Sequence, residues 1–247
     1  MMKTLRMTLL SMTILITSIS LQSCLDDDDD YPASVRYPNA LVTVKTGNAD
    51  SCYFQLDDKT TLFPTNLSKH PYGKKEVRAL VNFSETNENS HGYSKAVHVN
   101  WIDSILTKPA IPSLGVESDK KYGKDPVEII NDWVTIAEDG YLTLRFRSIW
   151  STGRTHWVNL LTNVNAENPY EVEFRHNAEG DTNGRWGDAL VAFNLKDLPD
   201  TQGKTVKLKL RWNSFSGEKT AEFNYCSQKG TKGSLQVENL KITTNLK

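Results

Sequence analysis

Two glutamates lie two positions apart in a stretch of alternating residues, where a glycoside hydrolase could carry its paired carboxylates. Glu171 and Glu173 share one face of the strand predicted over residues 170–176. A working pair faces each other across a cleft, roughly 5–10 Å apart, and one carboxyl is desolvated so that its pKa rises. Arg175 lies on the same face. The pattern therefore favours a solvated, charge-compensated strand face, with a glycan hydrolase as an alternative.

The remaining nucleophiles and ligands do not combine into a recognised catalytic or metal-binding spacing. No HxH, HExxH, GxSxG or phosphate-cradling glycine loop occurs. Ser151 and His156 share a short segment, but proximity in a loop makes no triad. Single histidines beside aromatic residues are usually packed or exposed and seldom bind metals; they are His70, His91, His98, His156 and His176. We predict no enzyme, no catalytic residue, no metal and no cofactor.

The segment 177–188 has the composition of a binding loop. It is long and rich in glycine and asparagine, and it carries Arg185 and Trp186. Tryptophan and arginine on a polar loop are residues that binding hot spots favour. The alternative is a turn whose tryptophan folds back as a lid on the end of the domain.

A second candidate is a modification site. Asp103, Ser104 and Ile105 match the short Asp-Ser/Thr-aliphatic pattern that resembles an O-glycosylation site of secreted Bacteroidota proteins. Alternatively, Ser104 simply faces a neighbouring strand.

The clearest chemistry lies at the N-terminus. Residues 1–23 combine a basic start, an apolar run of about fifteen residues and a small residue at the end. This run is short for a membrane-spanning helix and typical of a secretory signal peptide. Leu21-Gln22-Ser23-Cys24 resembles a bacterial lipobox, in which the Cys24 thiol receives the lipid. Several acyl chains such as palmitate on one residue anchor a protein stably.

Five consecutive aspartates follow, Asp26, Asp27, Asp28, Asp29 and Asp30. Like charges in a run repel one another, so residues 24–36 are predicted to form a lipidated acidic tether. The run also resembles the export signal that sends Bacteroidota lipoproteins to the outer leaflet of the outer membrane. We expect surface display, with periplasm-facing attachment as the alternative.

The charge balance argues against a nucleic-acid partner, and the positions of the cysteines argue against a disulfide. The chain has 29 basic and 30 acidic residues. Without the signal peptide and the five aspartates the balance is 27 to 25, which provides no field to steer nucleic acid. Cys52 and Cys226 lie far apart in strand-like segments, which favours two buried single thiols over a disulfide.

Period-two alternation in the first half predicts a barrel domain over residues 37–108. Five short strands in about seventy residues fit a closed OB-like barrel, which leaves no exposed sheet edge. The predicted strands are 40–45, 51–57, 60–64, 76–83 and 95–106.

The second half, residues 113–247, alternates almost continuously. Eight strands, most with one apolar face, predict a β-sandwich, with a tight hairpin turn at 138–140. The predicted strands are 133–137, 141–150, 156–161, 170–176, 188–195, 205–212, 219–225 and 235–243.

Two local signals interrupt this all-β pattern. Pro109 and Pro112 cannot sit inside a central strand, so we place a hinged domain boundary there. Asp125-Pro126-Val127-Glu128 is typical of a helix start, with Asp125 as the cap and Glu128 completing a capping box.

Several segments are similar to the NigD-like lipoproteins of the Bacteroidota: YPNALVTVK (37–45), FQLDD (54–58), EVRALVNF (76–83), DWVTI (132–136) and GYLTLRF (140–146). The resemblance covers essentially the whole chain. It implies an all-β fold with an N-terminal OB-like barrel and a C-terminal β-sandwich. It implies no catalytic residues.

We therefore expect an outer-membrane lipoprotein, anchored through Cys24, that acts as a non-enzymatic binding or accessory module. Its partner would be an unknown protein or glycan and no nucleic acid. The family's name, taken from a gene beside a bacteriocin, makes an immunity or export accessory protein a further alternative.

Overall fold

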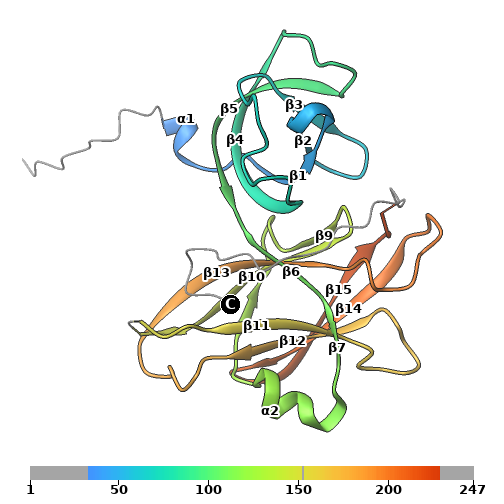
Figure 1. Cartoon of the computed structure of the whole chain (residues 1–247). Helices are drawn as coiled ribbons and strands as arrows, with labels where there is room; N and C mark the ends of the chain where they lie inside the picture. The colour runs from blue at the N-terminus through green and yellow to red at the C-terminus, as the bar shows by residue number, and fades with distance from the viewer. Residues whose placement is uncertain (1–32, 152, 229–247) are drawn as a thin grey trace, which may run out of the picture.

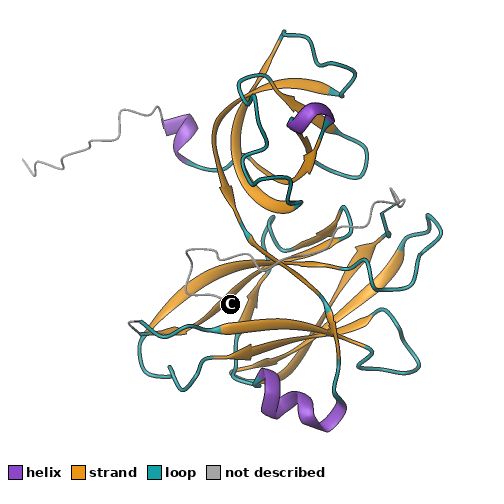
Figure 2. Ribbon diagram, viewed as in Figure 1, coloured by secondary structure: helices purple, strands orange, loops and turns teal. Residues whose placement is uncertain are grey.

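The computed structural model describes residues 33–151 and 153–228. The predicted signal peptide, residues 24–32 of the predicted tether with Cys24 and Asp26–Asp30, and the predicted strand 235–243 lie outside these residues. The end of the predicted tether, residues 33–36, is instead a short helix held to the barrel, where the Ser34 and Val35 carbonyls accept hydrogen bonds from the side chains of Asn82 (3.1 Å) and Trp101 (2.5 Å). The described chain forms two β domains, one above the other in Figure 1, and its helical segments are short and peripheral (Figure 2). These are α1 (Ala33–Arg36), η1 (Asn48–Asp50), η2 (Gly115–Glu117) and α2 (Ser118–Tyr122).

The N-terminal domain is a closed barrel in the order β1-β2-β3-β5-β4. Its strands are β1 (Ala40–Thr46), β2 (Cys52–Gln55), β3 (Thr61–Pro64), β4 (Val77–Thr86) and β5 (Lys95–Ser104). Alternate residues fill the barrel, as Val77, Ala79 and Val81 do from β4. The predicted OB-like barrel is confirmed.

The C-terminal domain is the predicted sandwich. The barrel-side sheet has the order β6-β13-β10-β8, with β9 also paired to β10. Its strands are β6 (Leu106–Pro109), β8 (Glu128–Ile130), β9 (Ile136–Glu138), β10 (Tyr141–Trp150) and β13 (Arg185–Asn194).

The distal sheet has the order β15-β14-β12-β11-β7. Its strands are β7 (Ile111–Pro112), β11 (Trp157–Thr162), β12 (Glu171–Asn177), β14 (Val206–Ser214) and β15 (Gly217–Tyr225). Leu142, Leu144 and Phe146 of β10 meet Val172 and Phe174 of β12 in the core between the sheets. α2 lies against the distal sheet on the side away from the barrel (Figure 1).

The proline segment is no hinge. β6 pairs with β13 in the barrel-side sheet, and β7 pairs with β11 in the distal sheet, so the chain crosses from one sheet to the other within a few residues. Pro109 and Pro112 end these two strands at sheet edges, which are positions that tolerate a missing N–H.

The predicted helix start at 125–128 is wrong. Glu128–Ile130 pairs with β10 as β8, opposite Arg147 and Arg145. The Asp125 carboxylate accepts a hydrogen bond from the Ala178 N–H (2.7 Å), across the fold and not at a helix end. Long-range strand pairing therefore overrides the local capping pattern.

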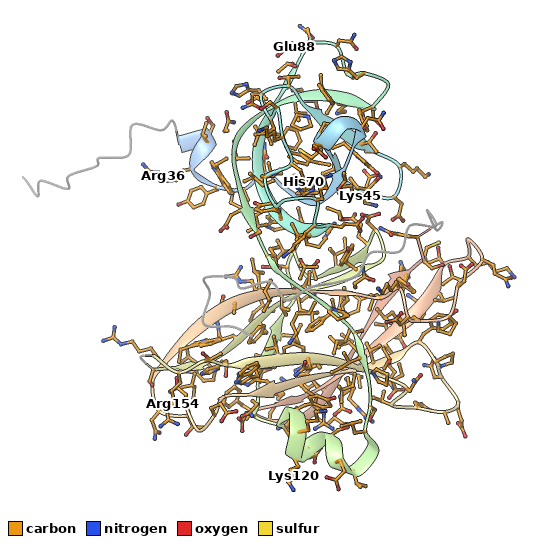
Figure 3. All side chains as sticks on the ribbon, viewed as in Figure 1. Arg36, Lys45, His70, Glu88, Lys120 and Arg154 are labelled. Atoms are coloured by element: carbon orange, nitrogen blue, oxygen red, sulfur yellow. The ribbon has the colours of Figure 1, made fainter. Side chains whose placement is uncertain are left out.

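A polar interface holds the two domains together. The wholly buried Arg78 donates from Nη1 to Thr43 Oγ1 (2.9 Å) inside the barrel domain, and from Nε to Thr143 Oγ1 (3.3 Å) in the sandwich. Lys45, at the end of the barrel that faces the sandwich in Figure 3, pairs with Asp139 (2.9 Å). The barrel therefore stands on the barrel-side sheet in a defined orientation.

An apolar cluster completes this interface. Leu41 and Ile105 of the barrel side pack with Val134 and Ala192 of the sandwich. Both a polar and an apolar contact thus tie the domains, in place of the predicted hinge.

Candidate functional site

A pocket of about 650 Å³ lies where the chain leaves the barrel and enters the sandwich. We call it the interdomain groove. The barrel side contributes Leu80 and residues 103–105, and the sandwich contributes Leu106, Arg145, Trp150 and residues 185–190. Because buried contacts join the two domains, the two walls of the groove have a fixed position relative to each other.

Arg185 and Trp186 line this groove, but not from a loop. They are the first residues of β13 and pair with Trp150 and Ile149 of β10. Trp186 contacts Phe215 (ring centroids 4.8 Å apart), which agrees in part with the lid alternative. Its side chain is nevertheless 58% exposed, so much of the ring is free to meet a ligand.

The charges in the groove divide into two kinds. Asp188 is held by Arg145 (2.6 Å) and Arg147 (2.5 Å), and hydrogen bonds from these guanidiniums lower the pKa of its carboxyl. Arg185 and Asp103 make no ion pair with any described residue. One cation and one anion in the groove therefore remain available to a ligand.

Ser104 ends β5 on the wall of the same groove, half-buried opposite Ala79 of β4. It thus faces a neighbouring strand, as the alternative to modification proposed. O-glycosylation at Ser104 stays a prediction.

Two histidines that appear isolated in the sequence meet in the sandwich core. His156 Nδ1 lies 2.8 Å from His176 Nε2, and His156 Nε2 lies 3.2 Å from Asp181 Oδ2. Burial, and then the proximity of His156, lower the pKa of His176 to about 4. The ring of Trp150, which also lines the groove, stacks on His156 at 4.0 Å.

Sequence patterns did not indicate this His176–His156–Asp181 chain, although both histidines continue the inward-facing alternation of their strands. Ser151 contributes its backbone N–H to Asp181 (2.9 Å). No described hydrogen bond joins the Ser151 hydroxyl to His156, so the pair forms no nucleophile and base. The chain instead orders the core beneath the groove.

The paired glutamates are not a solvated face. Glu171, Glu173 and Arg175 are all buried to more than nine-tenths. The predicted charge compensation is present: Glu173 meets Arg211 (2.8 Å) and Arg175 (2.9 Å), while Lys209 reaches Glu171 (3.3 Å). A hydrogen bond from Asn165 does most to lower the pKa of Glu171, which is the opposite of what a general acid requires.

The two described cysteines are free thiols. Cys52 is buried in the barrel, where desolvation raises the pKa of its thiol to about 11, whereas Cys226 is half-buried. Across residues 33–151 and 153–228, no cluster of three histidine, cysteine or acidic side chains is arranged to hold a metal. Nor does any helix in these ranges have the length and apolarity to cross a bilayer.

Comparisons with known proteins agree with this architecture. A family profile described as the NigD-like N-terminal OB domain matches residues 41–105, and one described as the NigD-like C-terminal beta sandwich domain matches residues 109–225. No protein of curated function matches the sequence significantly.

Solved structures extend the comparison. A toxin-related protein from Parabacteroides distasonis is 38% identical, with a TM-score of 0.67 over 76% of this chain and 92% of that one. A NigD-like immunity protein from Bacteroides caccae is 20% identical (TM-score 0.53, 77% and 91% covered). A protein from Bacteroides fragilis named as a lipoprotein is 11% identical (TM-score 0.51, 78% and 98% covered). The last two share the fold.

Proposed function

The chain belongs to the NigD-like family, and from that premise we propose that it is a lipid-anchored, non-enzymatic binding or accessory protein of the outer membrane. The interdomain groove is its ligand site. The proposal places the anchor on Cys24 and the folded domains outside the cell, beyond the acidic tether.

The groove is the observation that carries the binding role. Its volume of about 650 Å³ falls in the range of ligand pockets. It combines an exposed aromatic ring, Trp186, with an available cation and anion, Arg185 and Asp103. All three side chains come from strands, which position a ligand more accurately than mobile loops do.

The anchor rests on the N-terminal sequence. The lipobox-like Leu21-Gln22-Ser23-Cys24 and the aspartate run support lipidation and export. The shared fold with a Bacteroides protein named as a lipoprotein supports the anchor as well. Attachment that faces the periplasm is the alternative.

The non-enzymatic role is supported by the paired glutamates. Glu171 and Glu173 are both engaged by cationic side chains, so neither is placed as a general acid or nucleophile. A glycan hydrolase would need another pair of carboxylates.

An immunity or export accessory role for a secreted antimicrobial peptide is the second candidate. It is favoured by the shared fold with the NigD-like immunity protein from Bacteroides caccae. Neighbouring genes for a bacteriocin and its transporter would favour this role, whereas a glycan-utilisation cluster would favour a glycan ligand.

The test is a pull-down from outer-membrane extracts together with a glycan array. Wild type and Trp186→Ala are compared, and Trp157→Ala, an exposed tryptophan on the distal sheet (41% exposed), is the matched control. We expect ligands that wild type and Trp157→Ala retain and Trp186→Ala loses. Turnover of a polysaccharide that requires Glu171 or Glu173 would overturn the non-enzymatic role.

A further inference from the structure

One edge of β13 is unpaired along half of the strand. β10 pairs with β13 from Arg185 to Asn194 on one side. On the other side, β6 pairs only with Val191–Asn194. Residues 185–190 therefore have no strand neighbour on that side within the described chain, and all six line the interdomain groove.

Two backbone hydrogen bonds at the C-terminal end of β13 show which of its residues direct their backbone groups toward the groove. The Asn194 carbonyl accepts from the Ala110 N–H (3.1 Å) on the side of β6, whereas the Leu195 N–H donates to the Gly140 carbonyl (2.9 Å) on the side of β10. Successive residues of a strand direct their backbone groups to opposite edges. Trp186, Asp188 and Leu190 therefore present their N–H and C=O groups to the groove.

The opposite wall keeps this edge open. After Ser104 the chain joins β13 only at Leu106, the first residue of β6, so β5 and residues 185–190 of β13 diverge from this point as the two sides of a wedge. Leu80, Ile105 and Leu190 form an apolar lining at the closed end of the wedge. Arg185, at the outer end of β13, is the available cation.

We propose that the groove binds an extended polypeptide segment of a partner protein, which adds to β13 as a further strand in line with β6. This inference rests on the proposed binding function and names its ligand class. An apolar side chain of the segment packs against Leu80 and Ile105, and an acidic side chain pairs with Arg185.

The periodicity of the edge favours a polypeptide over a glycan. Groups on alternate residues repeat about every 6.6 Å, because a strand rises about 3.3 Å per residue. Another extended backbone repeats its donors and acceptors at that same interval, whereas sugar hydroxyls do not. Six residues of edge span about 20 Å, which suits a segment of five to six residues.

The adjoining stretch of the same edge of β13 is already paired with a strand of this chain. β6 pairs parallel to β13 from Val191 onward, so the sheet accepts a neighbour at this edge. Long unpaired edges are usually blunted by proline, by lysine or by a covering loop. Residues 185–190 contain neither residue; of their two charged side chains, Asp188 is neutralised by Arg145 and Arg147, and Arg185 lies at the outer end of the edge. No described loop pairs with this segment.

The test uses a random heptapeptide phage library against unlipidated protein of residues 25–247. Peptides enriched by wild type are synthesised, and their binding is measured by fluorescence polarisation. Asp103→Trp places a bulky ring on the groove wall, on the face of β5 away from the barrel core, and Ser84→Trp, at an exposed serine at the far end of β4, is the matched control. We expect binding to Ser84→Trp and at least about tenfold weaker binding to Asp103→Trp, with both variants retaining the melting temperature of the wild type.

N-methylation of the peptide separates strand addition from other binding modes. Methyl groups on the amides of one parity should weaken binding about tenfold, since they remove the hydrogen bonds to β13, and those of the other parity should change it little. Equal tolerance of both parities would overturn strand addition while leaving the groove as the binding site. Equal binding to Asp103→Trp, or a dimer of this chain that Asp103→Trp dissociates, would overturn the proposal that the groove binds a peptide of a partner protein. A pull-down in which Trp186→Ala retains every ligand of the wild type would instead contradict the proposed function.

Discussion

Arg78 of the barrel reaches Glu138 of the sandwich, with Nη2 3.2 Å from Oε2, and the arginine side chain is fully buried. No other described cation lies within ion-pairing distance of Glu138. This pair joins the Lys45–Asp139 ion pair and the apolar cluster in fixing the relation between the two domains, and with it the shape of the groove.

Arg78→Leu should destabilise the protein by roughly 3–5 kcal/mol, because it leaves a half-buried carboxylate without its partner. The measurement is the free energy of unfolding in urea. Lys95→Leu is the control: it breaks the exposed ion pair with Glu85 and should cost less than about 1 kcal/mol. Adding Glu138→Leu to Arg78→Leu should recover part of the loss, and a loss no greater than that of the control would contradict a structural role for the pair.

The His176 pKa predicts a defined pH window of destabilisation. It falls from an ordinary 6.5 to about 4 in the folded protein, because burial disfavours the charged ring. Between pH 6.5 and about 4 the unfolded chain takes up a proton that the folded chain does not. The stability present above pH 6.5 is therefore lost as the pH falls through this window, by up to roughly 3 kcal/mol.

Urea titrations at several pH values check this. His176→Gln should flatten the profile between pH 6.5 and 4, since the titrating group is gone. His91→Gln, which changes an exposed histidine of the barrel, should leave the profile unchanged. An identical slope in His176→Gln would show that other groups account for the pH dependence.

Trp186→Ala should affect binding much more than stability. Its ring is more than half exposed, and its main aromatic contact, Phe215, is worth roughly 0.5–1.5 kcal/mol at most. We expect a small decrease in melting temperature together with the loss of the ligands found in the pull-down. The reverse result, a marked decrease in melting temperature with every interaction retained, would identify Trp186 as a structural lid.

Lipidation and export can be separated by two variants. Metabolic labelling with an alkyne fatty acid should tag wild type and should not tag Cys24→Ala, since the thioether forms on sulfur. Replacement of Asp26–Asp30 by alanine should leave the label in place but reduce cleavage by protease added to whole cells. A labelled Cys24→Ala protein would disprove the lipobox, and unchanged cleavage would disprove the export signal.

The sequence predicts the fold well wherever alternation is strong. The β10 range follows directly from the alternation of Leu142, Leu144 and Phe146 with polar neighbours. The prediction from sequence fails where pairing with a strand far away in the sequence decides the local structure. Glycine and asparagine before Arg185 favour a loop, but pairing with β10 extends the strand to that residue.

Burial of charge is the other feature that local patterns miss. Arg78 takes the polar face of its strand, and only contact with a second domain buries it. Likewise, Arg175 pairs with Asp119 of α2 (2.6 Å), so the distal sheet carries a covering helix above a face that alternation alone assigns to solvent. The groove also depends on packing between residues far apart in the sequence. The sequence therefore indicated Trp186 as a candidate binding residue but did not predict the groove around it.

The crossing of β6 and β7 has a consequence for how such proteins can be taken apart. The residues that leave the barrel supply an edge strand to each sheet of the sandwich. A fragment that begins after Pro112 would lack both strands and expose two sheet edges at once, which promotes edge-to-edge aggregation. The barrel and the sandwich therefore cannot be separated at the prolines as two independent domains. A recombination event that exchanges one barrel for another must keep residues 106–112 with the sandwich.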